Sequence, residues 1–292
     1  MTHLRLQNTF FFSALVSLLL LSACSSSKTE PPLNEDPPQE KEATTTKTPS
    51  EEELNNFQVT LEDGSSLDIY YQTPTRRDLA INVANMLREC HNNFLAIFGE
   101  LPPFSTTIVL VDRDLFYAKT ASPEWIHALY HRGKIFIPIS PDEPIDYIRL
   151  YRSLKHEYTH SVVNVLTEGQ CPAWIDEGLA QWFEGADKKS DHYILANWLK
   201  SHRAISLVRL QKGFVTLNEK QAKVGYAQSF FAVQDLINTY GVKRFPIYFE
   251  FLRQEKSHPR RAFFKAFGLT ERSYEKRLRI KMNRWAISYR RT

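Results

Sequence analysis

The chain has 292 residues, of which 42% are hydrophobic and 24% charged, and its formal net charge is +4 with neutral histidines. These values are ordinary for a globular protein and leave room for one large domain or two closely associated lobes. No internal repeat is visible in the sequence, so a repeat architecture is excluded.

The first 23 residues have the features of a signal peptide. Arg5 gives the start a positive charge, an apolar run follows from Phe10 to Leu21, and Ser22 and Ala23 precede Cys24. Such a run is too short for a transmembrane span. The Leu-Ser-Ala-Cys order resembles a bacterial lipoprotein signal, which implies a lipid on Cys24, attachment to a membrane and a place in the cell envelope. Ser25 favours the outer membrane, facing the periplasm. Ordinary cleavage and an uncleaved anchor are the alternatives.

Residues 24–53 are predicted to be a disordered tether. They are rich in serine, threonine, proline and acidic residues and contain almost no large apolar side chain. Such a segment cannot bury enough surface to offset the entropy lost on ordering. We therefore expect a single folded domain over 54–292, which the tether holds at some distance from the lipid.

The first part of that domain, 54–141, is predicted to be a sheet lobe. Phe57 to Gln72 alternates as two short strands around an Asp-Gly turn, and Thr75 to Gly99 has the apolar periodicity of a helix. Thr106 to Val111 is an apolar run typical of an inner strand. A second hairpin is expected to pair Trp125 to Tyr130 with Lys134 to Ile139, the latter as the edge of the sheet.

The remaining part, 142–292, is predicted to be a helical lobe. Pro144 is expected to open a long helix, with Asp142 or Ser140 as its cap. The fold class is α+β, with a small mixed sheet, a helical lobe and this long helix between them. Further helices are expected near His192 to Ser201, Tyr226 to Tyr240, Val242 to Arg253, Pro259 to Phe267 and Thr270 to Trp285.

The long helix contains His156, Glu157 and His160 in the pattern H-E-x-x-H. Because the two histidines are four positions apart, both rings can converge on one metal ion. Glu177 follows His160 by 17 positions, after a turn at Gly169, and could supply a third ligand from a second helix. The alternative is that the histidines are solvated or core residues that match by accident.

Three protein ligands leave a fourth position for water, as in catalytic zinc sites. Zinc lowers the pKa of that water, and Glu157 is then free to act as general base, so hydrolysis of a peptide or amide bond is predicted. His127 and His131 are also four positions apart, but no glutamate follows them at a useful spacing.

HEYTH followed by PAWIDEGLAQWFEG resembles the gluzincin metallopeptidases, specifically the bacterial peptidase-MA-like proteins with a thermolysin-like catalytic domain. The resemblance covers roughly 57–241. It implies zinc held by His156, His160 and Glu177, with Glu157 as general base and a zincin-like fold. It also implies an edge strand that binds a peptide or protein substrate. The upstream segment WIHALYHRGKIFIP departs from the family's glycine-rich form, so the substrate edge is expected to have its own shape.

Three further residues have two interpretations each. Tyr226, expected at the start of its helix, corresponds to a family tyrosine that could donate a hydrogen bond to an oxyanion, or it is a core aromatic. Cys90 and Cys171 could form a disulfide in an oxidising compartment, or be two buried thiols.

The end of the chain is basic. From Arg253 to Thr292 there are 13 lysines and arginines and three glutamates. Nucleic acid is not expected as a partner of an exported protein. Attraction to anionic lipid or cell-wall polymer is one interpretation, and a solvated helix face is the other.

The sequence therefore predicts a lipid-anchored zinc metallopeptidase that hydrolyses peptide bonds in the cell envelope. Two alternatives remain: a zinc-binding lipoprotein without catalysis, and an amidase acting on peptidoglycan cross-links.

Overall fold

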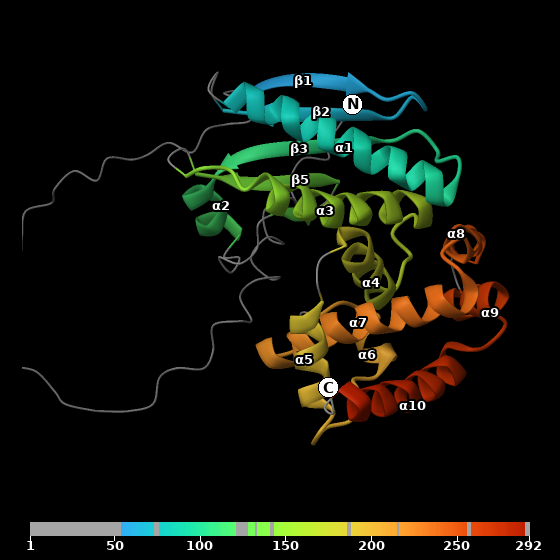
Figure 1. The fold of residues 1–292 in the computed structure, drawn as a ribbon. Helices are drawn as coiled ribbons and strands as arrows, with labels where there is room; N and C mark the ends of the chain where they lie inside the picture. Colours follow the sequence, from blue (N-terminus) through green and yellow to red (C-terminus); the bar gives the residue numbers. More distant parts are fainter. Residues whose placement is uncertain are drawn as a thin grey trace, which may run out of the picture.

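A computed structural model describes residues 54–72, 76–120, 128–131, 133–140, 143–185, 188–214, 216–255 and 258–289. The predictions for the signal peptide, Cys24, the tether and His127 lie outside these residues. The described chain forms a sheet with helices packed against it, followed by a helical part (Figure 1). None of the described helices combines the length and apolar composition that crossing a bilayer requires.

The sheet has five strands in the order β1-β2-β3-β5-β4. The outer pairs β1–β2 and β4–β5 are antiparallel, whereas β2–β3 and β3–β5 are parallel, which confirms the predicted mixed sheet. The strands are β1 (Asn55–Thr60), β2 (Ser66–Tyr71), β3 (Ser105–Asp112), β4 (Leu129–His131) and β5 (Lys134–Ile139).

The sheet has β1 at one edge and β4 at the other, so the prediction that Lys134 to Ile139 forms an edge strand is wrong. One side of β5 pairs with β3, as at Ile137 opposite Leu110, and its other side pairs with β4, as at Ile135 opposite Tyr130. Ile135 and Ile137 are fully buried, as expected of an inner strand. The short antiparallel β4 is therefore the edge strand beyond β5.

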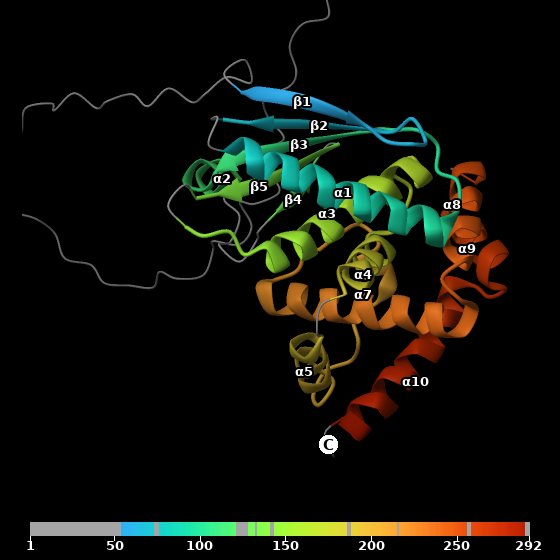
Figure 2. The ribbon, with the colours of Figure 1, turned by 45° about the horizontal axis from the view of Figure 1, so that its top comes forward.

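Two helices pack on one face of the sheet, α1 (Arg77–Phe98) and α3 (Tyr147–Thr167), as Figure 2 shows. A short helix, α2 (Arg113–Thr120), follows β3 and was not predicted. The helix α3 begins three residues beyond Pro144, and Asp146 is its cap, which corrects the expected start. The Asp146 carboxylate accepts a hydrogen bond from the Arg149 backbone N–H at 3.0 Å and so satisfies one free donor of the first turn.

The helix α3 lies between two hydrophobic cores. Leu154, Tyr158 and Val162 are fully buried in the core of the sheet and α1, as their helical spacing predicts. The neighbouring Val163 belongs to the core of the following helices. Packing on both sides therefore leaves only the arc that carries His156 and His160 free to line a site.

The helical part comprises α4 (Ala173–Glu184), α5 (Lys189–Trp198), α6 (Leu207–Leu210), α7 (Glu219–Tyr240), α8 (Arg244–Gln254), α9 (Pro259–Phe267) and α10 (Glu271–Tyr289). The one-turn α6 was not predicted. Tyr226 does not begin its helix: α7 starts seven residues earlier, where the Asn218 side chain accepts a hydrogen bond from the Gln221 N–H at 2.9 Å. This cap satisfies a backbone N–H of the first helical turn. The pattern Asn-x-x-Gln is its signal in the sequence, and the prediction overlooked it.

Of the two interpretations of Cys90 and Cys171, the structure supports two separate thiols and not a disulfide. Cys90 is buried in the core of the sheet and α1, whereas Cys171 packs against the core of the later helices. Burial raises the pKa of the Cys90 thiol to about 12, so it stays protonated and unreactive at neutral pH.

A buried hydrogen-bond network joins the first hairpin to α1 and α3. The His91 ring is 1% exposed, its Nε2 is 2.9 Å from the Asp63 carboxylate, and its Nδ1 is 2.8 Å from the Tyr158 hydroxyl. Replacing Asp63 by alanine would leave a buried ring nitrogen without its partner. We expect Asp63→Ala to lower the free energy of unfolding by about 1–3 kcal/mol, measured by urea denaturation.

The control for this prediction is Asp68→Ala on β2. Asp68 also makes two side-chain hydrogen bonds, to Gln58 and Ser105, but both are exposed to water. Water can replace these bonds, so a loss of less than about 0.5 kcal/mol is expected. Equal losses of unfolding free energy in the two variants would show that the buried hydrogen-bond network stabilises the protein no more than a surface contact does.

Candidate metal centre

The two histidines of the motif lie side by side on α3. The ring centroids of His156 and His160 are 5.0 Å apart and the rings are inclined at 76°. The Nε2 atoms face the same carboxylate oxygen, Glu177 Oε2, at 3.6 Å from His156 and 3.9 Å from His160. The structure therefore brings together all three predicted ligands from two helices.

Glu177 reaches this position because the chain reverses sharply between α3 and α4. Glu168 ends α3 in the left-handed conformation at φ 48°, and Gly169 follows at φ 73°. The helix α4 then packs against α3 on one side and α7 on the other. At Gly178 the contact with α7 is so close that a Cβ atom would lie 2.4 Å from the Ser229 carbonyl oxygen. The residue after the third ligand is therefore required to be glycine.

The geometry and chemistry of these donors fit zinc. The three ligand atoms lie within 4.8 Å of one another, and a tetrahedral ion with ligands at about 2.1 Å would separate them by about 3.4 Å. Glu177 Oε2 is buried and has no hydrogen-bond partner within the described residues, as expected of an atom directed at an ion. Among the described residues this is the only group of three or more side chains arranged to hold a metal.

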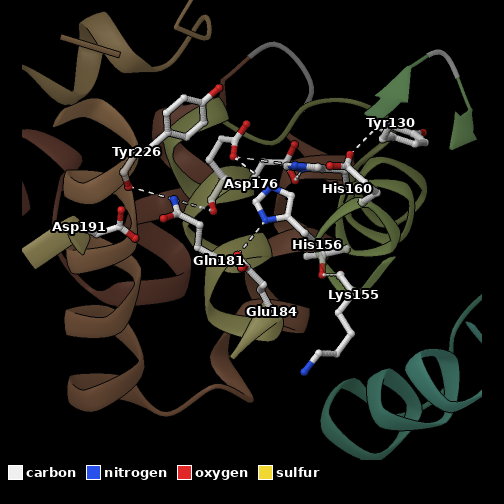
Figure 3. A network of polar contacts seen from close by, with 12 residues as sticks. Tyr130, Lys155, His156, His160, Asp176, Gln181, Glu184, Asp191 and Tyr226 are labelled. Carbon is white, nitrogen blue, oxygen red and sulfur yellow. Dashed lines mark hydrogen bonds and ion pairs between the residues drawn. The ribbon is translucent and has the colours of Figure 1, made fainter. Parts of the chain in front are cut away.

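Two carboxylates hold the far side of the histidine rings. The Nδ1 atom of His160 is 3.0 Å from Asp176, and the Nδ1 atom of His156 is 3.4 Å from Glu184, as the dashed lines in Figure 3 indicate. These contacts place a proton on Nδ1 and leave Nε2 free for a metal. Both acids were missed in the sequence. The available signal was that Glu184 lies seven positions after Glu177, on the same face of α4.

The charges of the site suit a metal centre. Burial alone would raise the pKa of Glu177, but His160 and His156 hold it below its ordinary value, so the ligand stays ionised. Burial raises the pKa of Glu157, although the same two histidines oppose the shift. A carboxylate with a raised pKa is a better proton acceptor near neutral pH.

The edge strand β4 contacts the site directly. The backbone N–H of Tyr130 donates a hydrogen bond of 2.6 Å to Glu157 Oε2, and the Tyr130 ring stacks on His160 with centroids 6.4 Å apart. One oxygen of Glu157 is thus held by the sheet edge. Because β4 has only three residues, its contact with Glu157 lies at the centre of the strand. The edge of the sheet therefore lies next to the predicted metal ligands.

Tyr226 lies in the first half of α7, on the α7 side of the two histidines, and in Figure 3 its hydroxyl points away from their rings. Its ring stacks on Phe214 with centroids 4.5 Å apart, and Gln181 of α4 donates a hydrogen bond to the Tyr226 carbonyl at 2.9 Å. The charge of Glu177, burial and the charge of Glu157 together raise the pKa of its phenol, so Tyr226 keeps its proton at neutral pH.

The sequence matches a family model over much of its length. Residues 111–283 match the model described as the Peptidase MA superfamily, a segment that contains the two histidines and Glu177. The chain belongs to the Peptidase MA superfamily. Its membership confirms the resemblance to gluzincin-type zinc metallopeptidases. No curated protein matches this superfamily member in sequence.

Solved structures are similar to this Peptidase MA member over part of their length. Aminopeptidase A of Legionella pneumophila, in complex with aspartic acid, matches with 13% identity and a TM-score of 0.46, over 76% of this chain and 27% of that one. An M1 zinc metallopeptidase mutant of Deinococcus radiodurans, bound to a Tyr-Ser-Ala substrate, matches with 15% identity and a TM-score of 0.44, over 80% of this chain and 51% of that one. The chain thus spans from about a quarter to half of these proteins.

Zinc binding is expected to release about two protons at pH 7. Burial lowers the pKa of both rings, but Glu177 and Glu184 raise that of His156 to about 10, and Asp176 and Glu177 raise that of His160 to about 9. Each metal-free ring is therefore protonated at neutral pH and must lose one proton to bind zinc. Zinc affinity should rise with pH until it passes these values. Calorimetry in buffers of different ionisation enthalpy measures the protons released, and a value near zero would contradict the expected protonation.

Removing the carboxylate behind His156 is expected to weaken the site without destroying it. In Glu184→Gln the side chain keeps its shape but no longer stabilises the ring by its charge. Such partners of a metal-bound histidine typically contribute about 10–100-fold in metal affinity. We expect a loss of about tenfold, measured by competition with a chelator. Unchanged affinity would mean that Glu184 does not orient His156.

Proposed function

We propose that this protein is a zinc-dependent peptidase in which Glu157 is the general base. The observation that carries the proposal is the convergence of His156 Nε2, His160 Nε2 and Glu177 Oε2, beside a second, partly buried glutamate, Glu157, that is held by the sheet edge. When bound, zinc would polarise the substrate carbonyl and make an attacking water more acidic. Proton transfer, substrate binding and oxyanion stabilisation are assigned to the protein's own groups.

Glu157 is placed to move the proton. Its Oε2 is held by the Tyr130 N–H, and its raised pKa favours accepting a proton near neutral pH. We infer that the carboxylate takes a proton from the attacking water and delivers it to the nitrogen of the leaving amine. The hydrogen bond from Tyr130 keeps the carboxylate oriented during both transfers.

The edge strand β4 is the proposed substrate-binding strand, with its Tyr130 N–H engaged by Glu157 and its remaining outer backbone groups left for a substrate. An extended peptide can add to an exposed sheet edge through main-chain hydrogen bonds. The Tyr130 contact with Glu157 and the stacking of Tyr130 on His160 show that this edge adjoins the metal ligands. A peptide or protein substrate aligned along β4 would therefore pass its main chain beside the general base.

Tyr226 is proposed as a hydrogen-bond donor to the oxyanion. It retains its proton at neutral pH, and the charges of Glu177 and Glu157 both act on its phenol, which places it near the site. We expect Tyr226→Phe to lower kcat by about 100-fold, because a lost oxyanion donor typically costs that much or more. Zinc content should not change, since the ring still stacks on Phe214. Full activity of this variant would make Tyr226 a packing residue only.

The site of action is proposed to be the bacterial cell envelope, at the outer membrane facing the periplasm. The support is the signal-like start of the chain, with Cys24 after Leu-Ser-Ala, and the polar segment 24–53 that follows. Replacing Cys24 by alanine should move the protein from the membrane fraction to the soluble fraction, or block its processing. A mature wild-type protein whose mass shows no lipid on Cys24 would contradict lipidation.

One experiment separates the proposed peptidase from its alternatives. The full-length protein, purified in neutral detergent, is assayed for zinc, for cleavage of an unfolded protein and for cleavage of peptidoglycan cross-links. A peptidase should bind about one zinc per chain and cleave the unfolded protein. Cleavage of cross-links alone would favour an amidase. Bound zinc without either activity would favour a binding lipoprotein.

A further inference from the structure

A groove lies on the helical part, between the segment 199–204 that follows α5 and one face of α10. Its volume is about 610 Å³, and it is lined by Leu199, His202, Arg203, Ala204, Arg279, Asn283 and Ile287. Arg279, Asn283 and Ile287 follow one another at intervals of four residues on α10. Figures 1 and 2 show α5 and α10 flanking this end of the molecule. None of the lining residues belongs to the metal centre.

The polar lining of the groove is cationic. Arg203 and Arg279 contribute guanidinium groups, and within the described part of the chain no carboxylate lines the groove. Arg279 uses one nitrogen to bond Glu275 at 2.6 Å, while its Nε atom is buried and has no hydrogen-bond partner among the described residues. The Arg279 side chain as a whole is 40% exposed, so the outer end of its guanidinium group remains open to a ligand in the groove.

The surrounding helix adds positive charge. From 271 to 289, α10 has six lysines and arginines and two glutamates. Both glutamates are engaged: Glu271 is buried and accepts hydrogen bonds from Gln211 and Trp174, and Glu275 pairs with Arg279. Two of the six cations are also paired, Arg279 with Glu275 and Lys281 with Asp235, and the other four leave the exposed surface of the helix cationic, which attracts anionic groups.

Apolar side chains accompany these cations. Leu199, Ala204 and Ile287 line the same groove, and Ile287 is 52% exposed. Ile280, one heptad before Ile287 on α10, is 54% exposed. Exposed isoleucines beside lysines and arginines are typical of a helix that lies at a membrane surface. A soluble polyanion would use the cations but would leave these apolar groups in water.

We propose that this groove binds the phosphate headgroup of an anionic phospholipid. Arg203 and the exposed end of the Arg279 guanidinium group would hold the phosphate through charge-assisted hydrogen bonds. Leu199, Ala204 and Ile287 would contact the start of the acyl chains. The volume suits a headgroup and glycerol rather than a whole lipid. Such binding would hold the helical part against a membrane surface, independently of the proposed catalysis and of lipidation at Cys24.

The test is native mass spectrometry of the full-length protein in neutral detergent, with short-chain phosphatidylglycerol and phosphatidylcholine as probes. We expect one phosphatidylglycerol to bind per chain at least about tenfold more tightly than phosphatidylcholine. Arg279→Gln and Arg203→Gln should each reduce that binding at least about fivefold. The matched control is Arg277→Gln, which removes an equal charge from an exposed position of α10 outside the groove and should have less than a twofold effect.

Three results would overturn the proposal. Equal binding of the two lipids would remove the requirement for an anionic headgroup. An equal effect of Arg277→Gln and Arg279→Gln would indicate general attraction to a basic helix. Inorganic phosphate or a soluble polyanion that binds as tightly as phosphatidylglycerol would show that the apolar lining contributes nothing. Circular dichroism confirms that each variant is folded, and the two groove variants, one on a helix and one in a connecting segment, test the site independently.

Discussion

Replacing Glu157 by glutamine is expected to lower kcat/KM for peptide hydrolysis by about 1,000-fold or more while the protein keeps its zinc. The amide has nearly the same shape as the carboxylate, and its oxygen can still accept the hydrogen bond from the Tyr130 N–H. It cannot accept a proton from water at neutral pH. The three metal ligands, His156, His160 and Glu177, are unchanged.

The measurement pairs steady-state hydrolysis of an unfolded protein with the zinc content of the same sample. The control is Glu100→Gln, which makes the same chemical change at an exposed position after α1 and should behave like wild type. Loss of zinc in Glu157→Gln would mean that Glu157 is needed to build the site. Unchanged hydrolysis would refute its role as general base.

The second large effect is expected at Gly178, in the middle of α4. Alanine normally stabilises a helix by about 1 kcal/mol relative to glycine. Here the added Cβ would lie 2.4 Å from both the Ser229 carbonyl oxygen and the Val233 Cγ2 atom of α7. The carbonyl belongs to the backbone of a packed helix and cannot move alone, so α4 and α7 must separate. We expect Gly178→Ala to lower the free energy of unfolding by about 3 kcal/mol.

The same variant should weaken zinc binding, because Glu177 precedes Gly178 and moves with α4. Urea denaturation of the metal-free protein and competition with a chelator measure the two effects. Gly225→Ala on α7 is the comparison: its Cβ would approach ring atoms of Phe214 at 2.8 Å, which are side-chain atoms that can shift. A smaller loss is expected there. A stabilised Gly178→Ala protein would show that helix propensity outweighs the close packing.

Much of the metal centre could be predicted from the sequence because its geometry is local. His156 and His160 are one helical turn apart, so any helix through them places both rings on one side. Glu177 is reached by one turn and a short helix, and the turn residue Gly169 signals the reversal. The strands β1, β2 and β3 and the helix α9 also follow from short-range patterns of apolar and turn residues.

The remaining features depend on contacts between distant segments. Only the sheet order shows that β4, and not β5, is the edge, since both belong to one predicted hairpin. Only packing separates Cys90 and Cys171 into different cores, and only the approach of α4 turns Asp176 and Glu184 toward the histidines.

The sequence by itself thus determined the mixed α+β character and the grouping of His156, His160 and Glu177, because backbone hydrogen bonding sets the helix and strand periods that bring near neighbours together. The tertiary structure decided the free edge of the sheet, the acids behind the histidines, the side of Tyr226 that meets the site and the cationic groove of α10. Each of these depends on how separate elements pack, and packing is set by the summed burial of many side chains far apart in the chain.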